Sequence, residues 1–216
     1  MFPSARLLWD DTGVKNLALT GGIASGKSFA ADEMVRLCAR AVRFDSDVSV
    51  RELLRGDRSV IEQIGEKFGP ACIAADGQGV DRGGLRARVF GDAAARRDLE
   101  RLLHPKVREE CLEVQAKAAK LGAPLFLAEV PLLFEGGFDF GQDLNLVVAV
   151  SRETQLKRLS ARDGFDTGLA ASILAAQLPM ERKVLLADVV FWNEGPRSVL
   201  TGQIERFLHT LLPHER

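Results

Sequence analysis

Short runs of apolar residues recur along the chain, separated by longer segments in which apolar side chains follow the helical period. The runs cover residues 17–20, 41–44, 125–130, 144–150 and 189–192. Continuous apolar runs that alternate with helices are typical of parallel strands covered on both faces. The pattern therefore predicts an α/β fold in three layers, with a five-stranded parallel sheet between two layers of helices.

The connections between these strands are unequal in length. The stretch after the second strand, 45–124, is too long for one crossover helix. It shows helical periodicity over 48–54, 59–68, 85–90 and 93–120, with breaks at glycine, proline and aspartate clusters. We expect this stretch to form a helical insertion beside the sheet. Further helices are predicted over 153–162, from there through 186, and over 199–212.

Composition narrows the class of protein. The 216 residues are 46% hydrophobic and 27% charged, with a formal net charge of −1, so no global charge favours nucleic acid or a membrane surface. Three widely spaced cysteines indicate neither a disulfide framework nor a zinc site. The first 13 residues lack the apolar core of a signal peptide, and no stretch approaches the ~20 apolar residues of a membrane span. We expect a cytoplasmic protein; the sequence does not indicate an oligomeric state.

One loop carries recognisable chemistry. The segment Gly21-Gly22-Ile23-Ala24-Ser25-Gly26-Lys27-Ser28 fits G-x-x-x-x-G-K-[ST] and lies between a predicted strand and a predicted helix. In such a loop, backbone N–H groups and the helix N-terminus surround phosphates. Lys27 reaches the β- and γ-phosphates, and the Ser28 hydroxyl binds Mg²⁺. The loop predicts binding of a nucleoside triphosphate, ATP with Mg²⁺.

Carboxylates follow two of the predicted strands, at the edge of the sheet where open α/β folds bind ligands. Asp45 and Asp47 come after the second strand, and Glu129 and Glu135 lie at and beyond the end of the third. Such groups can hold Mg²⁺ or its waters, or accept a proton from an attacking hydroxyl. Structural roles are open as well. Either aspartate can cap the helix that begins near residue 48. Glu129 can pair with a lysine or arginine, and Glu135 can be a solvated loop carboxylate.

The helix predicted over 153–162 is rich in arginine. Arg158 and Arg162 are four residues apart and therefore share a face. Two guanidinium groups on one face can bind phosphate oxygens and the charge of a transferring phosphoryl group. The alternative is a solvated basic face.

Together these motifs resemble the dephospho-CoA kinases, from about residue 16 to residue 211. The shared marks are Leu19-Thr20 with the loop 21–28, Asp45-Ser46-Asp47, Leu85-Arg86-Ala87-Arg88-Val89-Phe90, Leu103-His104-Pro105, Val130-Pro131-Leu132-Leu133-Phe134-Glu135, Gln155-Leu156 with Arg158 and Arg162, Gln177, and Ala187-Asp188 with Asn193 and Gly195. The phosphate loop alone fits many NTPases, whereas the order of the other marks is far more specific.

The resemblance implies transfer of the ATP γ-phosphoryl group to the ribose 3′-hydroxyl of dephospho-CoA, a small-molecule acceptor. It implies a P-loop NTPase-type fold with a nucleotide-binding core, 16–47 and 121–216, that includes a lid at about 152–180. The helical insertion, 48–120, would be the CoA-side substrate domain. Residues 1–15 would form an N-terminal extension without a counterpart in the family.

The match also implies roles for individual residues. Catalytic residues would be Asp47 as general base, with Lys27, Arg158 and Arg162 stabilising phosphoryl charge. Nucleotide contacts would come from Thr20, the loop 21–28 and Asn193, with Ser28 on the metal. The acceptor would meet Asp45, Arg86, His104, Leu133, Phe134 and Glu135. For His104 the alternative is a structural one, because Pro105 suits the first turn of a helix that would start there.

Three positions depart from the family pattern, and the segment after Asp47 is a few residues shorter than usual before the helix predicted to start at Ser59. Ser46 stands where the family usually has alanine. Ala24 stands where the family usually has glycine, and a small residue there should preserve the loop. Glu129 stands where the family often has aspartate.

Two other functions fit the phosphate loop. One is a different P-loop kinase, for a nucleotide or a hydroxylated metabolite. The other is a P-loop switch that binds nucleotide and signals by its conformation. The absence of a guanine-reading N-K-x-D sequence near the later strands counts against a GTPase-type switch.

Overall fold

The computed structural model of the chain describes residues 13–163 and 167–212. Its centre is a five-stranded sheet in the order β2-β3-β1-β4-β5, and every pair of neighbouring strands is parallel. The strands are β1 (Lys15–Gly21), β2 (Val42–Asp45), β3 (Leu125–Glu129), β4 (Leu144–Ala149) and β5 (Val189–Trp192). The predicted fold class and each predicted strand are confirmed, to within about two residues at the ends.

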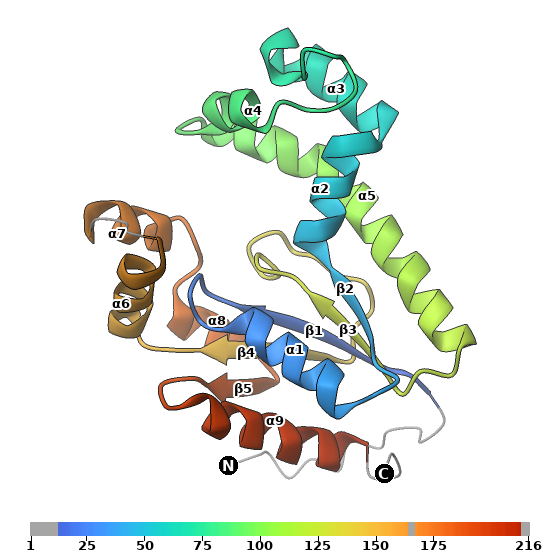
Figure 1. Ribbon diagram of the computed structural model, residues 1–216, viewed down its shortest axis with the longest axis vertical. Coiled ribbons are helices and arrows are strands. Elements are labelled where there is room, and N and C mark those ends of the chain that lie inside the picture. Colours follow the sequence, from blue (N-terminus) through green and yellow to red (C-terminus); the bar gives the residue numbers. More distant parts are fainter. Residues whose placement is uncertain (1–12, 164–166, 213–216) are drawn as a thin grey trace.

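The sheet is covered on both faces, which explains its uniformly apolar strands (Figure 1). Leu17 and Leu19 of β1 point into a cluster with α1 (Lys27–Leu37) and α9 (Arg197–Leu211). Ala18 lies between them in sequence and points into the opposite cluster, which includes Cys111 and Ala118 of the long helix α5 (Ala93–Lys120). The alternation of side chains along each strand therefore fills two separate cores.

The helical insertion stands beside the sheet (Figure 1). It consists of α2 (Ser46–Gly56), α3 (Arg58–Phe68), the short 3₁₀ helix η1 (Pro70–Cys72), α4 (Arg82–Val89) and α5. Four of these helices begin directly after an aspartate whose side chain accepts backbone N–H groups of the first turn; these are Asp45, Asp57, Asp81 and Asp92. The C-terminal part of α5 returns to the sheet, so the insertion is anchored to the core at both ends.

One alternative for His104 is wrong. His104 and Pro105 lie in the interior of α5, and no helix starts there. Proline removes one backbone donor in a helix interior but does not end this 28-residue helix. The neighbours Leu103 and Val107 are buried, and tertiary packing of this kind outweighs local propensity.

Three helices follow β4: α6 (Arg152–Asp163), α7 (Thr167–Ala175) and α8 (Met180–Leu186). Helices α6 and α7 pack on each other through Leu159, Ala170 and Leu174. They stand at the end of the sheet where the loop after β1 emerges (Figure 1). Among the described residues, no helix is long and apolar enough to cross a bilayer.

Candidate active site

The loop between β1 and α1 has the backbone shape that its glycines predict. Gly26 takes a left-handed φ of 94° and precedes α1, whose first turn has no side-chain cap. A β-carbon on Gly26 would lie 2.2 Å from the side-chain amide nitrogen of Asn193. A side chain at this position would therefore clash with Asn193, and the left-handed backbone disfavours it as well. The N–H groups at the start of α1 remain available to an anion.

Ala24 also adopts a left-handed conformation, with φ 60°. An L-residue with a β-carbon pays roughly 1–2 kcal/mol for this conformation, which glycine adopts freely. The loop thus keeps its shape at a modest cost, in line with the expectation for this departure from the family.

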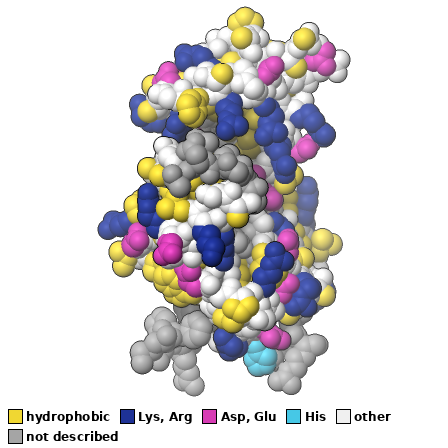
Figure 2. Space-filling view, turned by 60° about the vertical axis from the view of Figure 1, so that its left-hand side comes forward, with side chains coloured by type: hydrophobic (Ala, Val, Ile, Leu, Met, Phe, Trp, Pro, Cys, Tyr) yellow, Lys and Arg dark blue, Asp and Glu magenta, His cyan; other side chains and the backbone are white. Residues whose placement is uncertain are grey.

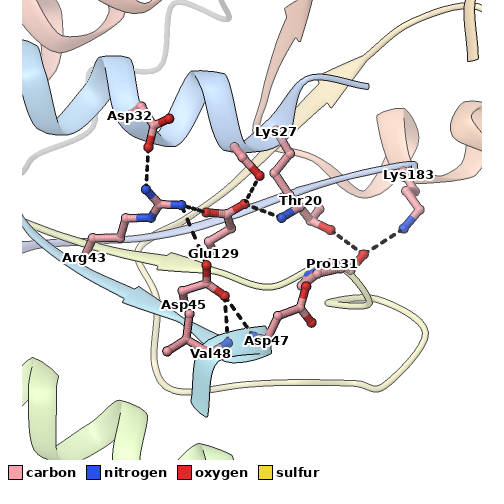
Figure 3. A network of polar contacts seen from close by, with 11 residues as sticks. Thr20, Lys27, Asp32, Arg43, Asp45, Asp47, Val48, Glu129, Pro131 and Lys183 are labelled. Carbon is pink, nitrogen blue, oxygen red and sulfur yellow. Dashed lines mark hydrogen bonds and ion pairs between the residues drawn. The ribbon is translucent and has the colours of Figure 1, made fainter. Parts of the chain in front are cut away.

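Glu129, at the end of β3, is the centre of the polar network in the site (Figure 3). It is 1% exposed, and Lys27 and Arg43 each form an ion pair with one of its two oxygens. The Ser28 hydroxyl donates to the same oxygen as Lys27, at 2.9 Å. Burial alone would raise the pKa of Glu129, but the two cations and the hydroxyl hold it below its usual value. Of the two roles open for Glu129, pairing with cations is the one present here.

Asp45 and Asp47 have separated roles. Asp45 Oδ1 accepts from the backbone N–H of Asp47 at 2.9 Å and of Val48 at 3.2 Å, so Asp45 is the cap of α2. Within the described part of the chain, the Asp47 carboxylate has no hydrogen bond or ion pair. It lies beside the network of Lys27 and Glu129 (Figure 3).

The environment of Asp47 alters its acidity. Although Asp47 is exposed, the protein around it displaces enough water for burial to raise the pKa of its carboxyl, against the pull of Lys27. The nearby carboxylates of Asp45 and Glu129 raise it further. An unpaired carboxylate of raised pKa beside a phosphate loop is suited to accept a proton.

Arg158 is engaged with the phosphate loop and is not a solvated residue. Its guanidinium donates to the carbonyl oxygens of Ala24 at 3.2 Å, Ser25 at 3.3 Å and Asn193 at 2.7 Å. The Asn193 amide in turn donates to the Ser25 carbonyl at 2.8 Å. Both side chains thus bind backbone carbonyl oxygens of the loop. Their predicted contacts with phosphate or nucleotide remain predictions, and the side chain of Arg162 lies outside the described part of α6.

Two glutamines hold the loop from the side of the later helices, and neither was among the predicted site residues. Gln155 donates to the carbonyl of Ile23 at 2.8 Å, and Gln177 accepts from the N–H of Ile23 at 3.0 Å. The sequence offered one signal, since both glutamines are among the residues shared with the family. Neutral amides give no pattern of charge or spacing from which a contact with the loop could be derived.

We expect Arg158→Ala to lower kcat/KM for ATP by about 10- to 100-fold. Hydrogen bonds to a charged donor contribute about 1.5–3 kcal/mol, and three loop or loop-adjacent carbonyls lose theirs. The measurement is steady-state kinetics with ATP varied. Lys157→Ala, at an exposed position of the same helix, serves as the control. Equal kinetics for the two variants would show that the contacts of Arg158 with the loop do not contribute to the use of ATP.

The predicted acceptor residues come together only in part. Gly136, in the turn after β3, packs against His104 of α5, because a β-carbon on Gly136 would lie 2.8 Å from His104 Cε1. Glu135 forms an ion pair with Lys183 at 2.7 Å, so the solvated-loop alternative for Glu135 is wrong. Arg86 is exposed on α4, and the described contacts do not join it to this turn.

The remaining predicted residues near this turn point elsewhere. Leu133 is 2% exposed and belongs to the core, whereas Phe134 is half-buried at its edge. Any acceptor contact of Leu133 would go through its backbone. The Thr20 hydroxyl donates to the Pro131 carbonyl at 3.1 Å and so supports the turn from β1. Acceptor and nucleotide contacts of these residues remain predictions.

Comparison with known proteins agrees with this geometry. The dephospho-CoA kinase family profile matches residues 16–198. The dephospho-CoA kinase of Thiobacillus denitrificans is 41% identical over 190 residues, covering 88% of this chain and 91% of that protein. That of Anaeromyxobacter dehalogenans is 40% identical over 196 residues, covering 90% and 91%.

Solved structures agree on the fold. A Thermus thermophilus crystal structure has a TM-score of 0.76 and 29% identity, covering 92% of this chain and 98% of that one. The dephospho-CoA kinase from Campylobacter jejuni has a TM-score of 0.67 at 24% identity, covering 93% and 98%. The match of the family profile over residues 16–198, together with the relative that is 41% identical over 88% of this chain, shows that the protein belongs to the dephospho-CoA kinase family of ATP-dependent phosphotransferases.

Proposed function

We propose that the protein transfers the γ-phosphoryl group of ATP to the ribose 3′-hydroxyl of dephospho-CoA, giving CoA and ADP. The observation that carries this proposal is the unpaired carboxylate of Asp47 beside Lys27, at the end of the sheet where the phosphate loop lies. A phosphate loop and a carboxylate of raised pKa supply the two halves of phosphoryl transfer to an alcohol.

On the donor side, the backbone N–H groups of the loop 21–28 would bind the β- and γ-phosphates. Lys27 belongs to this loop, and its side chain pairs with Glu129. Its ammonium would meet the charge of the transferring group. Arg158 and Gln155 donate to carbonyl oxygens of the loop, and Gln177 accepts from the Ile23 N–H, so these three side chains hold the loop in shape.

On the acceptor side, Asp47 would accept the proton of the 3′-hydroxyl while its oxygen forms a bond to the γ-phosphorus. The bond from that phosphorus to the bridging oxygen of ADP breaks in the same step, and ADP leaves with the electron pair. The reaction needs no other reactant. Arg51, one turn after Asp47 on α2, lines a groove of about 540 Å³ together with Arg55 and Arg82. Glu52 and Asp76 also line this groove, but its three arginines outnumber them. Figure 2 shows Lys and Arg side chains (dark blue) on the upper part of the molecule, which is the helical insertion. The excess of arginine in the groove suits an acceptor with a diphosphate close to its ribose.

The residues present fit a Mg²⁺ ion. The Ser28 hydroxyl and a Glu129 oxygen lie 2.9 Å apart at the start of α1, and oxygen donors of this kind are what Mg²⁺ prefers. Ser28 would be a direct ligand, and Glu129 would accept hydrogen bonds from waters on the ion. When bound, Mg²⁺ neutralises charge on the phosphates.

The proposal also assigns the parts of the chain. Residues 16–47 and 121–216 form the nucleotide-binding core, with a lid at about 152–180, and 48–120 form the acceptor domain. The anchoring of α5 on the sheet, which brings His104 to Gly136, supports an acceptor site between the insertion and the core. A cytoplasmic location belongs to the same proposal.

The test is an assay with Mg-ATP and dephospho-CoA that follows product mass and the position of the new phosphate. We expect 3′-phosphorylated product. Nucleoside monophosphates and hydroxylated metabolites form the comparison panel. Activity on one of these, with none on dephospho-CoA, would instead identify another P-loop kinase. Tight nucleotide binding without turnover on any acceptor would favour a switch.

A further inference from the structure

A short segment, residues 177–183, lies between the phosphate loop and the turn after β3. We call it the strap. Near its start, Gln177 accepts from the N–H of Ile23 at 3.0 Å. The Met180 side chain packs over the same loop, since a β-carbon on Gly22 would stand 3.0 Å from Met180 Cε. The strap therefore contacts the donor side of the site.

The other contacts of the strap go to the turn 131–137. Lys183, on α8, is 0% exposed, and its Nζ lies 2.7 Å from Glu135 Oε1 and 3.3 Å from the Pro131 carbonyl oxygen. The N–H of Leu178 donates to the same Glu135 oxygen at 2.9 Å. Figure 3 shows Lys183 and Thr20 meeting the Pro131 carbonyl from different elements. The strap thus holds the turn at Pro131 and at Glu135.

Lysine side chains are rarely fully buried in proteins. Removing a charged group from water costs several kcal/mol, and an apolar side chain of similar size at such a position is often as stable or more so. The ion pair with Glu135 is therefore poorly explained by stability. What it supplies is a fixed distance and direction between α8 and the turn.

The position of that turn matters for the acceptor. Gly136, directly after Glu135, packs against His104 of α5 in the helical insertion. A continuous path of contacts runs from the phosphate loop through the strap and Glu135 to this helix.

We propose that the strap fixes the acceptor side of the site relative to the phosphate loop, and that Lys183 is a positioning residue for the reaction, acting through Glu135 and the Pro131 carbonyl. This inference rests on the proposed function. Lys183 itself does not touch the reacting atoms. Its contribution is the alignment of the acceptor hydroxyl with the γ-phosphoryl group, where displacements of about 1 Å can cost about 100-fold in rate.

The test compares Lys183→Met, Glu135→Gln and the double variant with the wild type and with Lys157→Met, the same substitution at an exposed lysine. We expect the first three to lose about 10- to 100-fold in kcat/KM for dephospho-CoA, with KM for ATP within about twofold of wild type. Because both residues act through one ion pair, the double variant should be little worse than either single one. A merely structural role would lower the melting temperature without this split between the two substrates.

Several outcomes would overturn the inference. One is unchanged kinetics for dephospho-CoA in the folded Lys183→Met variant, and another is additive losses in the double variant. If Lys183→Met does not fold, Glu135→Gln decides, since glutamine keeps the shape of glutamate and can still accept from the Leu178 N–H. If the wild type does not phosphorylate dephospho-CoA at all, the proposed function is refuted. If the wild type is active and the variants match it, only the role of the strap is refuted.

Discussion

Asp47→Asn is expected to lower kcat by about 10² to 10⁴ while the protein stays folded. A ribose hydroxyl is a poor nucleophile at neutral pH, and asparagine keeps the shape of aspartate without accepting the proton. Asp45, not Asp47, caps α2, so the substitution removes no cap hydrogen bond. ATP binding should change little, because its phosphates rest on the loop. The measurement is kcat alongside the melting temperature.

The raised pKa of Asp47 fixes the sign of two further observations. Only the ionised carboxylate is a base, so kcat should fall as the pH is lowered through the pKa of Asp47. This fall should occur at a higher pH than the pKa of an ordinary aspartate. Because the pKa of Asp47 is raised in the folded state, folding favours the protonated carboxyl. This contribution to the free energy of unfolding is fully present below the unfolded pKa and is lost as the pH rises through the folded pKa. Removing the charge in Asp47→Asn should therefore leave the melting temperature at neutral pH unchanged or higher.

The control for this variant is Asp45→Asn. Asparagine caps a helix about as well as aspartate, so a residue whose role is the cap should tolerate the change in both stability and turnover. A kcat near that of wild type in Asp47→Asn would reject the general base. A fall in its melting temperature together with kcat would indicate a structural role instead.

Lys27→Ala is expected to reduce kcat/KM for ATP by about 10²–10³, the loss seen when one preorganised donor to transition-state charge is removed. The Lys27 side chain is 13% exposed and pairs with Glu129, which keeps Arg43 and Ser28 as partners in the variant. The fold should therefore survive. The effect is on charge at the phosphates, not on packing.

Thermal stabilisation by Mg-ATP gives a second measurement for Lys27. At 100 times its Kd, a ligand that binds only the folded state stabilises it by about 2.7 kcal/mol, which raises the melting temperature. We expect this rise in the wild type and in Lys120→Ala, a control at an exposed lysine, and a much smaller one in Lys27→Ala. Absence of the rise in the wild type at millimolar Mg-ATP would contradict nucleotide binding by the loop.

Local features of the site could be predicted because their physical cause is local. The glycines of the phosphate loop, the lysine after them and the apolar strand before them are contiguous in the sequence, and backbone conformation there follows from residue type. The aspartates before the helices are the same kind of signal. The position of Asp47 after the second strand marked it as a candidate, and the resemblance to a family added its role as general base and the acceptor turn, which composition and spacing alone could not name.

Contacts between distant segments could not be predicted in this way. Glu129 and Lys27 are 102 positions apart, and Gln177 and Ile23 are 154 apart. No local pattern specifies such pairs, because they depend on which strand ends are neighbours in the sheet. The helix predicted over 93–120 is present, and the alternative of a helix start at Pro105 failed because burial of residues around it, contributed by other elements, outweighed the propensity of one residue.

The sequence by itself determined the parallel sheet, the phosphate loop and the order of the helices, since hydrophobic period and turn chemistry act over a few residues. The tertiary structure decided which aspartate caps and which remains free, since the cap is set by where β2 ends and α2 begins. It also decided that Glu129 holds Lys27 and Arg43 and that the one fully buried lysine of the described residues, Lys183, meets Glu135. Burial strengthens the attraction within such a charge pair, although it costs solvation of both charges, and burial exists only once the layers have packed.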